Sequence, residues 1–387
     1  MNLCVSCGVI FLLAASTLHA QTSQPDGSIP TFHVTTQIAT VPLVATRSDG
    51  SDVNDLHASD LRVFDNKKPQ TVRSFELMTP VQAYPGTGDA SQGAQLSRAD
   101  EYPHFTLILL DALNCTWSDQ IYARRAVEHL LDHFPAGQRI AILVLSDKLY
   151  LLHDFSANVD ELRASLRHFS VGEPYGGVTS SDGGGFSAKS SHPGPSNMPD
   201  PVEASQARFG NEGAFYQRNR TLETLNAFTA IAKLTKRVSG RKDLLWISSA
   251  FPLTIYGDRG QFGDSFYRQT QDAMRALSSS SLRLYPIDAR GLVASPKAQI
   301  NIDTMKEMAE ETGGKAFYNN NDLAGEVQRA LNDSRMGYLL TYAPNNFRED
   351  GSFHQIRVRV SRKGVNLRYR PGYYADLPPK PTSGKSE

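Results

Sequence analysis

Side chains that could bind a metal ion follow one strongly apolar stretch of the sequence. Residues 105–110 are almost continuously apolar, and Asp111, Asn114 and Thr116 come soon after them. Their oxygen atoms are hard donors of the kind that Mg²⁺, Mn²⁺ or Ca²⁺ prefers. Asp111 could equally accept backbone N–H groups near the helix expected to begin around Ser118. The residue types alone leave a metal ligand and a structural carboxylate as two open interpretations.

Other patterns that suggest enzymatic chemistry fit a structural role better. Ser265 lies in a Gly-Asp-Ser-Phe sequence similar to the nucleophile block of some esterases, but it precedes an expected helix that it could cap. Residues 312–315 (TGGK) lack the full pattern of a phosphate loop and are typical of a helix end, with Gly313 in the left-handed turn. His129 and His133 lie four apart without the glutamate of a zinc protease motif. We therefore predict that the protein is not an enzyme.

The first 20 residues have features of a secretory signal peptide. Residues 5–15 form an apolar run too short to span a bilayer comfortably, and small or polar residues lead to a cleavage point after Ala20. No Lys or Arg precedes the run, and a buried N-terminal strand is the alternative interpretation. We expect a secreted or periplasmic protein with no transmembrane segment after cleavage. Cys4 and Cys7 would leave with the signal, so that only Cys115 remains and no internal disulfide forms.

The composition argues against two broad classes of protein. Of 387 residues, 40% are hydrophobic and 21% are charged, which is not the composition of a wholly disordered chain. The 40 Lys and Arg residues equal the 40 Asp and Glu residues in number, whereas phosphate binding generally requires a concentrated basic surface. We expect no nucleic-acid partner.

Strand-like and helix-like segments alternate over residues 102–335. Apolar runs typical of strands buried on both faces are separated by amphipathic segments typical of helices. The expected strands are 105–110, 139–145, 244–247 and 282–287, and the expected helices are 118–133, 158–168, 221–238, 266–279 and 322–333. This alternation predicts an α/β fold with a doubly wound, mostly parallel sheet and helices on both faces.

The segments on either side of this domain are rich in β-pattern. Residues 31–80 and 336–375 alternate polar and apolar side chains, and we expect them to pack together as a small β-rich domain that flanks the α/β domain. Within the α/β domain, residues 171–213 contain a Gly/Ser/Pro-rich stretch and are expected to be a flexible insertion. Residues 376–387 are expected to be a disordered tail.

Several phrases in this order resemble a known family. They are 60–65 (DLRVFD), 69–75 (PQTVRSF), 110–116 (LDALNCT), 240–252 (GRKDLLWISSAFP), 284–291 (LYPIDARG), 309–317 (AEETGGKAF) and 370–374 (RPGYY). Over about residues 32–375, the chain is similar to the VWFA-related domain of the acidobacterial type, which is found in exported bacterial proteins and belongs to the von Willebrand factor type A (VWA) domain superfamily.

The resemblance implies a metal-ion-dependent adhesion site in a degenerate form. The family's first loop reads Asp-x-Ser-x-Ser, where this chain has Asp111 with Asn114 and Thr116 as substitutes. Thr221, which we expect to open its helix, matches the threonine of the second loop. Ser248 stands near the position where the third loop has an aspartate. Because at most one ligand is acidic, a bound Mg²⁺ (or Ca²⁺ or Mn²⁺) would be held weakly or would be absent.

The family resemblance favours an exported, non-enzymatic protein that binds a protein partner through this site, with the partner's carboxylate completing the coordination of any ion. The alternative is a structural component of cell-envelope assembly whose metal site is vestigial. The first hypothesis predicts that capture of the partner depends on Asp111, and the second predicts oligomers that survive a chelator.

Overall fold

A computed structural model describes residues 38–78, 104–134, 138–168, 201–236, 241–249, 266–293, 296–335, 337–345, 347–348 and 350–375. By compactness the chain divides into Met1–Thr36 and Gln37–Glu387, and all described residues belong to the second unit. The expected signal peptide at 1–20, the tail at 376–387, residue Ser265 and residues 171–200 of the expected insertion lie outside the described residues. The predictions about them therefore stay predictions.

A five-stranded mixed sheet forms the centre of the α/β part. Its strands are β5 (His104–Asp111), β6 (Ile140–Leu145), β7 (Leu149–Ser156), β8 (Arg241–Ser248) and β9 (Leu282–Asp288), in the spatial order β7-β6-β5-β8-β9. Neighbours among β5, β6, β8 and β9 are parallel, and β7 runs antiparallel to β6 at one edge. The prediction of an α/β fold is confirmed. Strand β7 was not predicted, because its half-exposed side chains form no apolar run.

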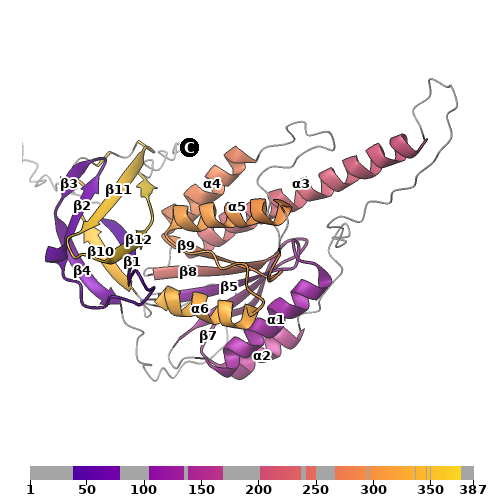
Figure 1. Ribbon diagram of the computed structural model, residues 1–387, viewed down its shortest axis with the longest axis horizontal. Coiled ribbons are helices and arrows are strands. Elements are labelled where there is room, and N and C mark those ends of the chain that lie inside the picture. The colour runs from indigo at the N-terminus through magenta and orange to yellow at the C-terminus, as the bar shows by residue number, and fades with distance from the viewer. Residues whose placement is uncertain are drawn as a thin grey trace, which may run out of the picture. The chain divides into compact units, whose positions relative to one another are not determined.

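Helices cover both faces of this sheet (Figure 1). One face packs against α1 (Trp117–Asp132), α2 (Val159–His168) and α6 (Leu323–Arg335). The other face packs against α3 (Pro201–Thr235), α4 (Tyr267–Ser279) and α5 (Pro296–Thr312). Successive strand residues point to opposite faces, so Ile108 and Leu110 join the first core whereas Leu107 and Leu109 join the second. This double burial explains why the parallel strands read as continuous apolar runs.

Strands from the two ends of the described chain pair with one another. The eight strands are β1 (Ala39–Arg47), β2 (Leu61–Asp65), β3 (Lys68–Gln70), β4 (Val72–Met78), β10 (Gly337–Tyr342), β11 (Phe353–Val360), β12 (Val365–Tyr369) and β13 (Gly372–Tyr374). They form two sheets with the orders β12-β1-β10-β4 and β13-β11-β2-β3, which share a third hydrophobic core. We refer to these two sheets as the β-sandwich. The predicted domain boundaries themselves stay predictions.

A buried carboxylate joins the two sheets of the β-sandwich. Asp65 on β2 is 4% exposed and accepts hydrogen bonds from the hydroxyls of Tyr342 and Tyr373, at 2.8 and 2.9 Å. Its other oxygen lies 2.8 Å from Nδ1 of His354. Because each partner comes from the C-terminal strands, this carboxylate fastens the first part of the chain to the last.

Two expectations about the helix α3 are wrong. The helix begins at Pro201, so residues 201–213 are helical rather than part of a flexible insertion, and Thr221 lies inside the helix rather than at its start. Residues 201–220 include the strong helix formers Ala, Glu, Gln and Arg, but they show no continuous apolar stripe. A search for hydrophobic periodicity therefore misses this half of the helix.

Helix α4 begins one residue later than expected. Its first residue is Tyr267, and Phe266 takes the cap position without a side-chain hydrogen bond to the helix.

Candidate functional site

The four parallel strands end together at one edge of the central sheet. Their last residues are Asp111 on β5, Leu145 on β6, Ser248 on β8 and Asp288 on β9. In open α/β sheets, ligands bind in the crevice beyond the carboxyl ends of the strands. We call this region the carboxyl edge. It contains Asp111, Asn114 and Ser248, three of the five residues expected to form the site.

Asp111 is the centre of a buried hydrogen-bond network at the carboxyl edge. Its Oδ2 accepts from Asn114 Nδ2 at 2.8 Å, from Trp246 Nε1 at 2.9 Å and from Ser248 Oγ at 2.7 Å. Its Oδ1 accepts from the backbone N–H of Asn114 at 3.0 Å. The residue is 2% exposed, and this burial raises the pKa of Asp111 even though the four donors act in the opposite direction.

Asn114 connects this network to helix α3. Its Nδ2 donates a second hydrogen bond to Thr224 Oγ1 at 2.8 Å, and Thr224 Oγ1 in turn donates to the carbonyl of Arg220. Both hydrogens of the Asn114 amide nitrogen are therefore in use. The loop 111–116 is held between β5 and α3 by side chains whose donors are satisfied.

Gln120 on α1 fixes the same loop from the other side. Its Nε2 donates to the carbonyls of Ala112 and Cys115, at 3.0 and 3.2 Å. The backbone N–H of Leu113 donates to the carbonyl of Leu145 at the end of β6. These bonds fix the shape of the loop without any ligand.

The other two expected site residues make their hydrogen bonds elsewhere. Thr116 is the N-cap of α1, and its Oγ1 accepts from the backbone N–H of Asp119 at 3.2 Å. Thr221 donates its hydroxyl to the carbonyl of Gln217 one turn earlier in α3. The residue of α3 that is bonded to the Asp111 network is Thr224.

This arrangement of donors does not fit a divalent cation at Asp111. Oδ2 of Asp111 already accepts three hydrogen bonds and Oδ1 accepts one, and Trp246 and Asn114 present N–H groups, which cannot ligate a metal. A cation on Oδ2 would require both of these side chains to turn away. Metal binding by the five residues stays a prediction.

The second carboxylate of the carboxyl edge is neutralised by an arginine. Asp288 accepts a bidentate pair of hydrogen bonds from Arg290, with Nε at 2.9 Å from Oδ1 and Nη2 at 2.7 Å from Oδ2. Such fork-to-fork pairs are among the strong interactions of carboxylates. Among the described residues, no group of three or more His, Cys, Asp or Glu side chains is placed to hold a metal ion.

Cys115 lies beside the network but is not a reactive thiol. The residue is 1% exposed, and burial, followed by the nearby charge of Asp111, raises the pKa of Cys115 well above its ordinary value. Ser249 Oγ lies 2.8 Å from Asp119 Oδ2 and 3.2 Å from Cys115 Sγ. A thiol that stays protonated is a poor nucleophile.

Exposed apolar side chains are found on the elements that begin at or leave the carboxyl edge. Trp117 is the first residue of α1 and is 54% exposed, and Tyr267 is the first residue of α4 and is 68% exposed. Leu292, in the segment after β9, is 65% exposed, and Tyr150, on β7 next to its turn with β6, is 40% exposed. Large aromatic side chains on a surface are a common feature of protein–protein interfaces.

Trp246 and Thr224 are the members of the network that sequence reasoning missed. Trp246 stands two residues before Ser248 on a strand, and strand residues two apart share a face. That spacing puts the indole on the same face as Ser248, and the pairing of β8 with β5 then brings it beside Asp111. Thr224 could not be found in the same way, because the start of α3 was placed wrongly.

No protein-family model matches the sequence, and no curated protein matches it. Two solved structures are similar to parts of it. One is an aerotolerance-related membrane protein from Bacteroides fragilis NCTC 9343 with multiple mutations to serines, at 11% identity and a TM-score of 0.33, covering 60% of this chain and 98% of that one. The other is the conserved hypothetical protein BatB from Bacteroides thetaiotaomicron, at 9% identity and a TM-score of 0.32, covering 59% and 98%.

These similarities indicate only a distant relation of fold and carry no argument about function. The fold itself defines an α/β protein with a mixed sheet between two layers of helices. Within the described part of the chain, no helix is both long and apolar enough to cross a membrane.

Proposed function

We propose that this is a non-enzymatic protein of the VWA type that acts outside the cytoplasm and binds a protein partner at the carboxyl edge. The observation that carries the proposal is the combination of a loop held by hydrogen bonds to β6, β8, α1 and α3 with exposed aromatic side chains on helices that begin at the same edge. Asp111 organises the loop, and Trp117 and Tyr267 supply contact area.

A binding role is supported by the way in which the polar groups of the carboxyl edge are used. Asp111, Ser248 and Asn114 bond to one another, Asp288 bonds to Arg290, and Cys115 is buried and protonated. A catalytic site generally keeps a nucleophile or base free to reach a substrate. Polar side chains that are hydrogen-bonded to one another instead fix the conformation of the loops that form the carboxyl edge.

Aromatic side chains supply much of the energy of protein–protein interfaces when a partner buries them. Trp117 and Tyr267 each begin a helix at this edge, so both are held by secondary structure rather than by a loose loop. Binding therefore requires little additional ordering of the backbone at these two residues.

The hydrogen-bond donors around Asp111 favour a binding mode in which no metal ion bridges the protein and its partner. The buried carboxylate of Asp111 then acts through the loop and does not contact the partner. This version differs from the adhesion-site hypothesis in a measurable way, because capture of the partner persists in a chelator. The apolar residues 5–15 motivate the proposed export.

The test is to immobilise the purified protein and to identify what it captures from the periplasmic and secreted fractions of the source cells, with EDTA and with Mg²⁺. A Trp117→Ala, Tyr267→Ala variant should lose the captured protein. The matched control is Leu234→Ala. Leu234 is 55% exposed near the C-terminal end of α3, so this variant should retain the captured protein.

Equal capture by the wild type and the Trp117→Ala, Tyr267→Ala variant would refute binding at this edge. If nothing is captured and the protein forms oligomers that survive EDTA in size-exclusion chromatography with light scattering, the structural role in envelope assembly becomes the better account.

A further inference from the structure

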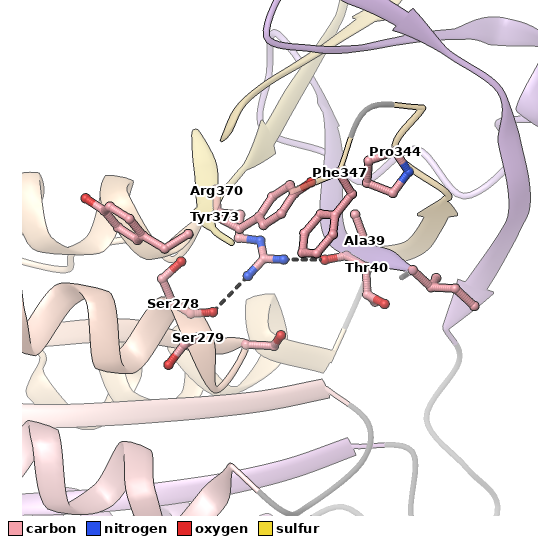
Figure 2. Close-up of a pocket in the computed structure, with 11 residues that line it drawn as sticks. Ala39, Thr40, Ser278, Ser279, Pro344, Phe347, Arg370 and Tyr373 are labelled. Carbon is pink, nitrogen blue, oxygen red and sulfur yellow. Dashed lines mark hydrogen bonds between the residues drawn. The ribbon is translucent and has the colours of Figure 1, made fainter. Parts of the chain in front are cut away.

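A second candidate site lies at the other end of the central sheet. Helix α4 runs from Tyr267 at the carboxyl edge to Ser279, just before β9 begins at Leu282. Between this last turn and the β-sandwich there is a cavity of about 190 Å³ (Figure 2). Its walls include strand β1, the segment after β10, and β13 with the residues just before it.

The one charged side chain among the lining residues is Arg370. Figure 2 shows its guanidinium group between the end of α4 and strand β1. Nη1 donates to the carbonyl of Ser278 at 2.9 Å, and Nη2 donates to the carbonyl of Thr40 at 2.7 Å. These two bonds fix the plane of the guanidinium, which also lies 5.8 Å from the centroid of the Tyr373 ring, but none of these contacts supplies a negative charge.

No carboxylate among the described residues forms an ion pair with Arg370. None of the eleven residues that line the cavity is Asp or Glu, and the guanidinium belongs to a residue only 8% exposed. Its Nε is buried and has no hydrogen-bond partner in the described part of the chain. This burial lowers the pKa of Arg370 to about 10. A buried, unpaired cation is costly, and an anion beside it would offset that cost.

The rest of the cavity offers hydroxyl groups, among them that of Ser281, and an aromatic wall. The side chain of Ser281 lines the cavity and makes no hydrogen bond with the described residues, and its backbone has φ +56°, a left-handed conformation that non-glycine residues seldom adopt. Ser281 directly follows the C-cap residue Ser280, so this conformation belongs to the turn that ends α4. Phe347, Tyr373 and Tyr374 supply the apolar side of the cavity.

We propose that this cavity binds a monocarboxylate, with the carboxylate on Arg370 and Ser281 and the carbon skeleton against Phe347 and Tyr373. A guanidinium group has five N–H donors, and Arg370 uses one on Nη1 and one on Nη2 to hold carbonyls, so each Nη keeps one N–H for a carboxylate oxygen. A single positive charge matches a monoanion, whereas a phosphate dianion would need more donors than these residues provide.

The carboxylate has two sources that share this chemistry: a free small acid, or the C-terminus of a peptide that ends in an apolar residue. Benzoate and acetate represent the first source, and inorganic phosphate tests the charge match. A short peptide ending in phenylalanine represents the second, and the same peptide with an amidated C-terminus is its control. Each compound is titrated into the purified protein by isothermal calorimetry, and thermal unfolding is followed in parallel, because a ligand specific for the folded state raises its stability.

The expected result is that benzoate binds more tightly than acetate, and that phosphate binds least. Ser279→Asp, which introduces a carboxylate at a residue lining the cavity, should weaken benzoate binding by about tenfold or more, because the added charge competes for Arg370. Ser279→Asn is the matched neutral variant and should bind benzoate as the wild type does. Arg370→Lys, which keeps the charge and loses the fork, should also weaken binding.

Undiminished benzoate binding by Ser279→Asp, or no binding of any carboxylate by the wild type, would overturn the proposal. If the peptide binds and its amide does not, the site recognises a peptide terminus. If neither peptide binds while benzoate does, the site recognises a free acid. Equal binding of the peptide and its amide would overturn the peptide C-terminus as the source of the carboxylate. The proposal does not depend on the function assigned to the carboxyl edge, since Trp117→Ala, Tyr267→Ala should leave benzoate binding unchanged and Ser279→Asp should leave capture of the protein partner unchanged.

Discussion

The indole N–H of Trp246 lies 2.9 Å from Oδ2 of Asp111, across the neighbouring strands β8 and β5. The indole can only donate, so it takes a position on the carboxylate that a metal ion would otherwise use. The ring is itself held in place by an edge contact with Phe228 on α3, at 5.0 Å between ring centroids. The carboxylate of Asp111, which the sequence suggests as a metal ligand, thus accepts hydrogen bonds from side chains of the protein itself.

Trp246→Phe should destabilise the protein by about 1–3 kcal/mol, because Asp111 loses a donor and remains buried. Trp246 helps to lower the raised pKa of Asp111, so the variant should have a still higher pKa at this carboxyl. When the folded pKa exceeds the unfolded one, the folded state binds the extra proton, and stability falls as pH rises through the folded pKa. The cost of the substitution should therefore be larger at pH 7 than in acid.

Urea unfolding of Trp246→Phe, Asp111→Asn and the double variant measures this dependence as a thermodynamic cycle. The loss in free energy of unfolding caused by Trp246→Phe should vary with pH in the protein that has Asp111. It should not vary with pH in the protein that carries Asp111→Asn. A cost that is the same in both backgrounds at every pH would show that the variant acts only through lost packing.

Mg²⁺, Ca²⁺ or Mn²⁺ at millimolar concentration should not raise the thermal unfolding temperature above that in EDTA, because the oxygens of Asp111 are already occupied. A ligand that binds only the folded protein must raise its stability. The control is Asp111→Ala measured in the same buffers. A metal-dependent rise in the wild type that disappears in this variant would restore the adhesion-site hypothesis.

Cys115 should react slowly with a thiol reagent in the native protein and rapidly in urea. The chain for this measurement has Cys4 and Cys7 replaced by serine, so that one thiol is counted. Because burial keeps the pKa of Cys115 well above the ordinary value, native labelling should increase little between pH 7 and pH 8.5. If the native protein is labelled as fast as the unfolded chain, the loop 111–116 opens readily. That result would contradict the proposal that this loop is held in one conformation for partner binding.

The parallel strands could be predicted because each is buried on both faces. The apolar runs that contain Leu109 and Ile142 are too short to span a membrane and lack the periodicity of an amphipathic helix, so a fully buried strand is the structure that they favour. The helix end at Gly313 was also predictable, since the residue has φ +77° and follows the last residue of α5. Here the local sequence and the fold agree.

The candidate site was predictable only in part, because its contacts join elements far apart in the sequence. Asp111 and Ser248 follow strands that are recognisable, so their meeting at one edge could be inferred. Asn114 bonds to Thr224 and not to the expected Thr221. The expectation placed Thr221 at the start of the helix, whereas both threonines lie well inside α3, and the sequence does not show which of them faces Asn114. The interaction of Trp246 with Asp111 depends on the pairing of β8 with β5, which no local pattern reveals.

Gly314→Ala should destabilise the protein by about 3 kcal/mol or more, because a Cβ at this position would lie 1.9 Å from the carbonyl oxygen of Leu284 and the backbone would have to move. The matched variant is Gly364→Ala. Gly364 has φ +73° and open space around it, so its substitution adds only the strain of a left-handed alanine, about 1 kcal/mol. Urea unfolding measures both, and equal costs would contradict the steric explanation.

Lys242→Met should make the protein more stable than the wild type near pH 7. Burial lowers the pKa of Lys242 from 10.5 to about 8, so the folded state resists carrying this charge. Because the unfolded state binds more protons between these two values, stability of the wild type rises with pH from about 8 to 10.5, and the advantage of the variant should shrink over that window.

The control for this pH dependence is Lys233→Met, which alters an exposed lysine of α3. Denaturant midpoints are measured for all three proteins at pH 7, 8, 9 and 10. The difference between Lys242→Met and the wild type should shrink as pH rises, whereas the difference between Lys233→Met and the wild type should not change. A gain that stays constant across these pH values would assign the effect to packing of the methionine and not to the buried charge. A loss of stability in Lys242→Met would mean that the hydrogen bond from Lys242 to the carbonyl of Thr235 outweighs that charge.

The pairing of β1 with β10 has a consequence for the order in which the molecule is assembled. Ala39 faces Tyr342 across the two strands, so the earliest described strand finds its neighbour only after the whole α/β part has been synthesised. Until then, the edges of β1 are unpaired, and exposed strand edges favour association with other chains. Folding of the α/β part first shortens the distance that these segments must close. The β-sandwich is then the last part to gain protection from aggregation, and a nascent chain that stalls before residue 337 has no partner for β1 except another molecule or a chaperone.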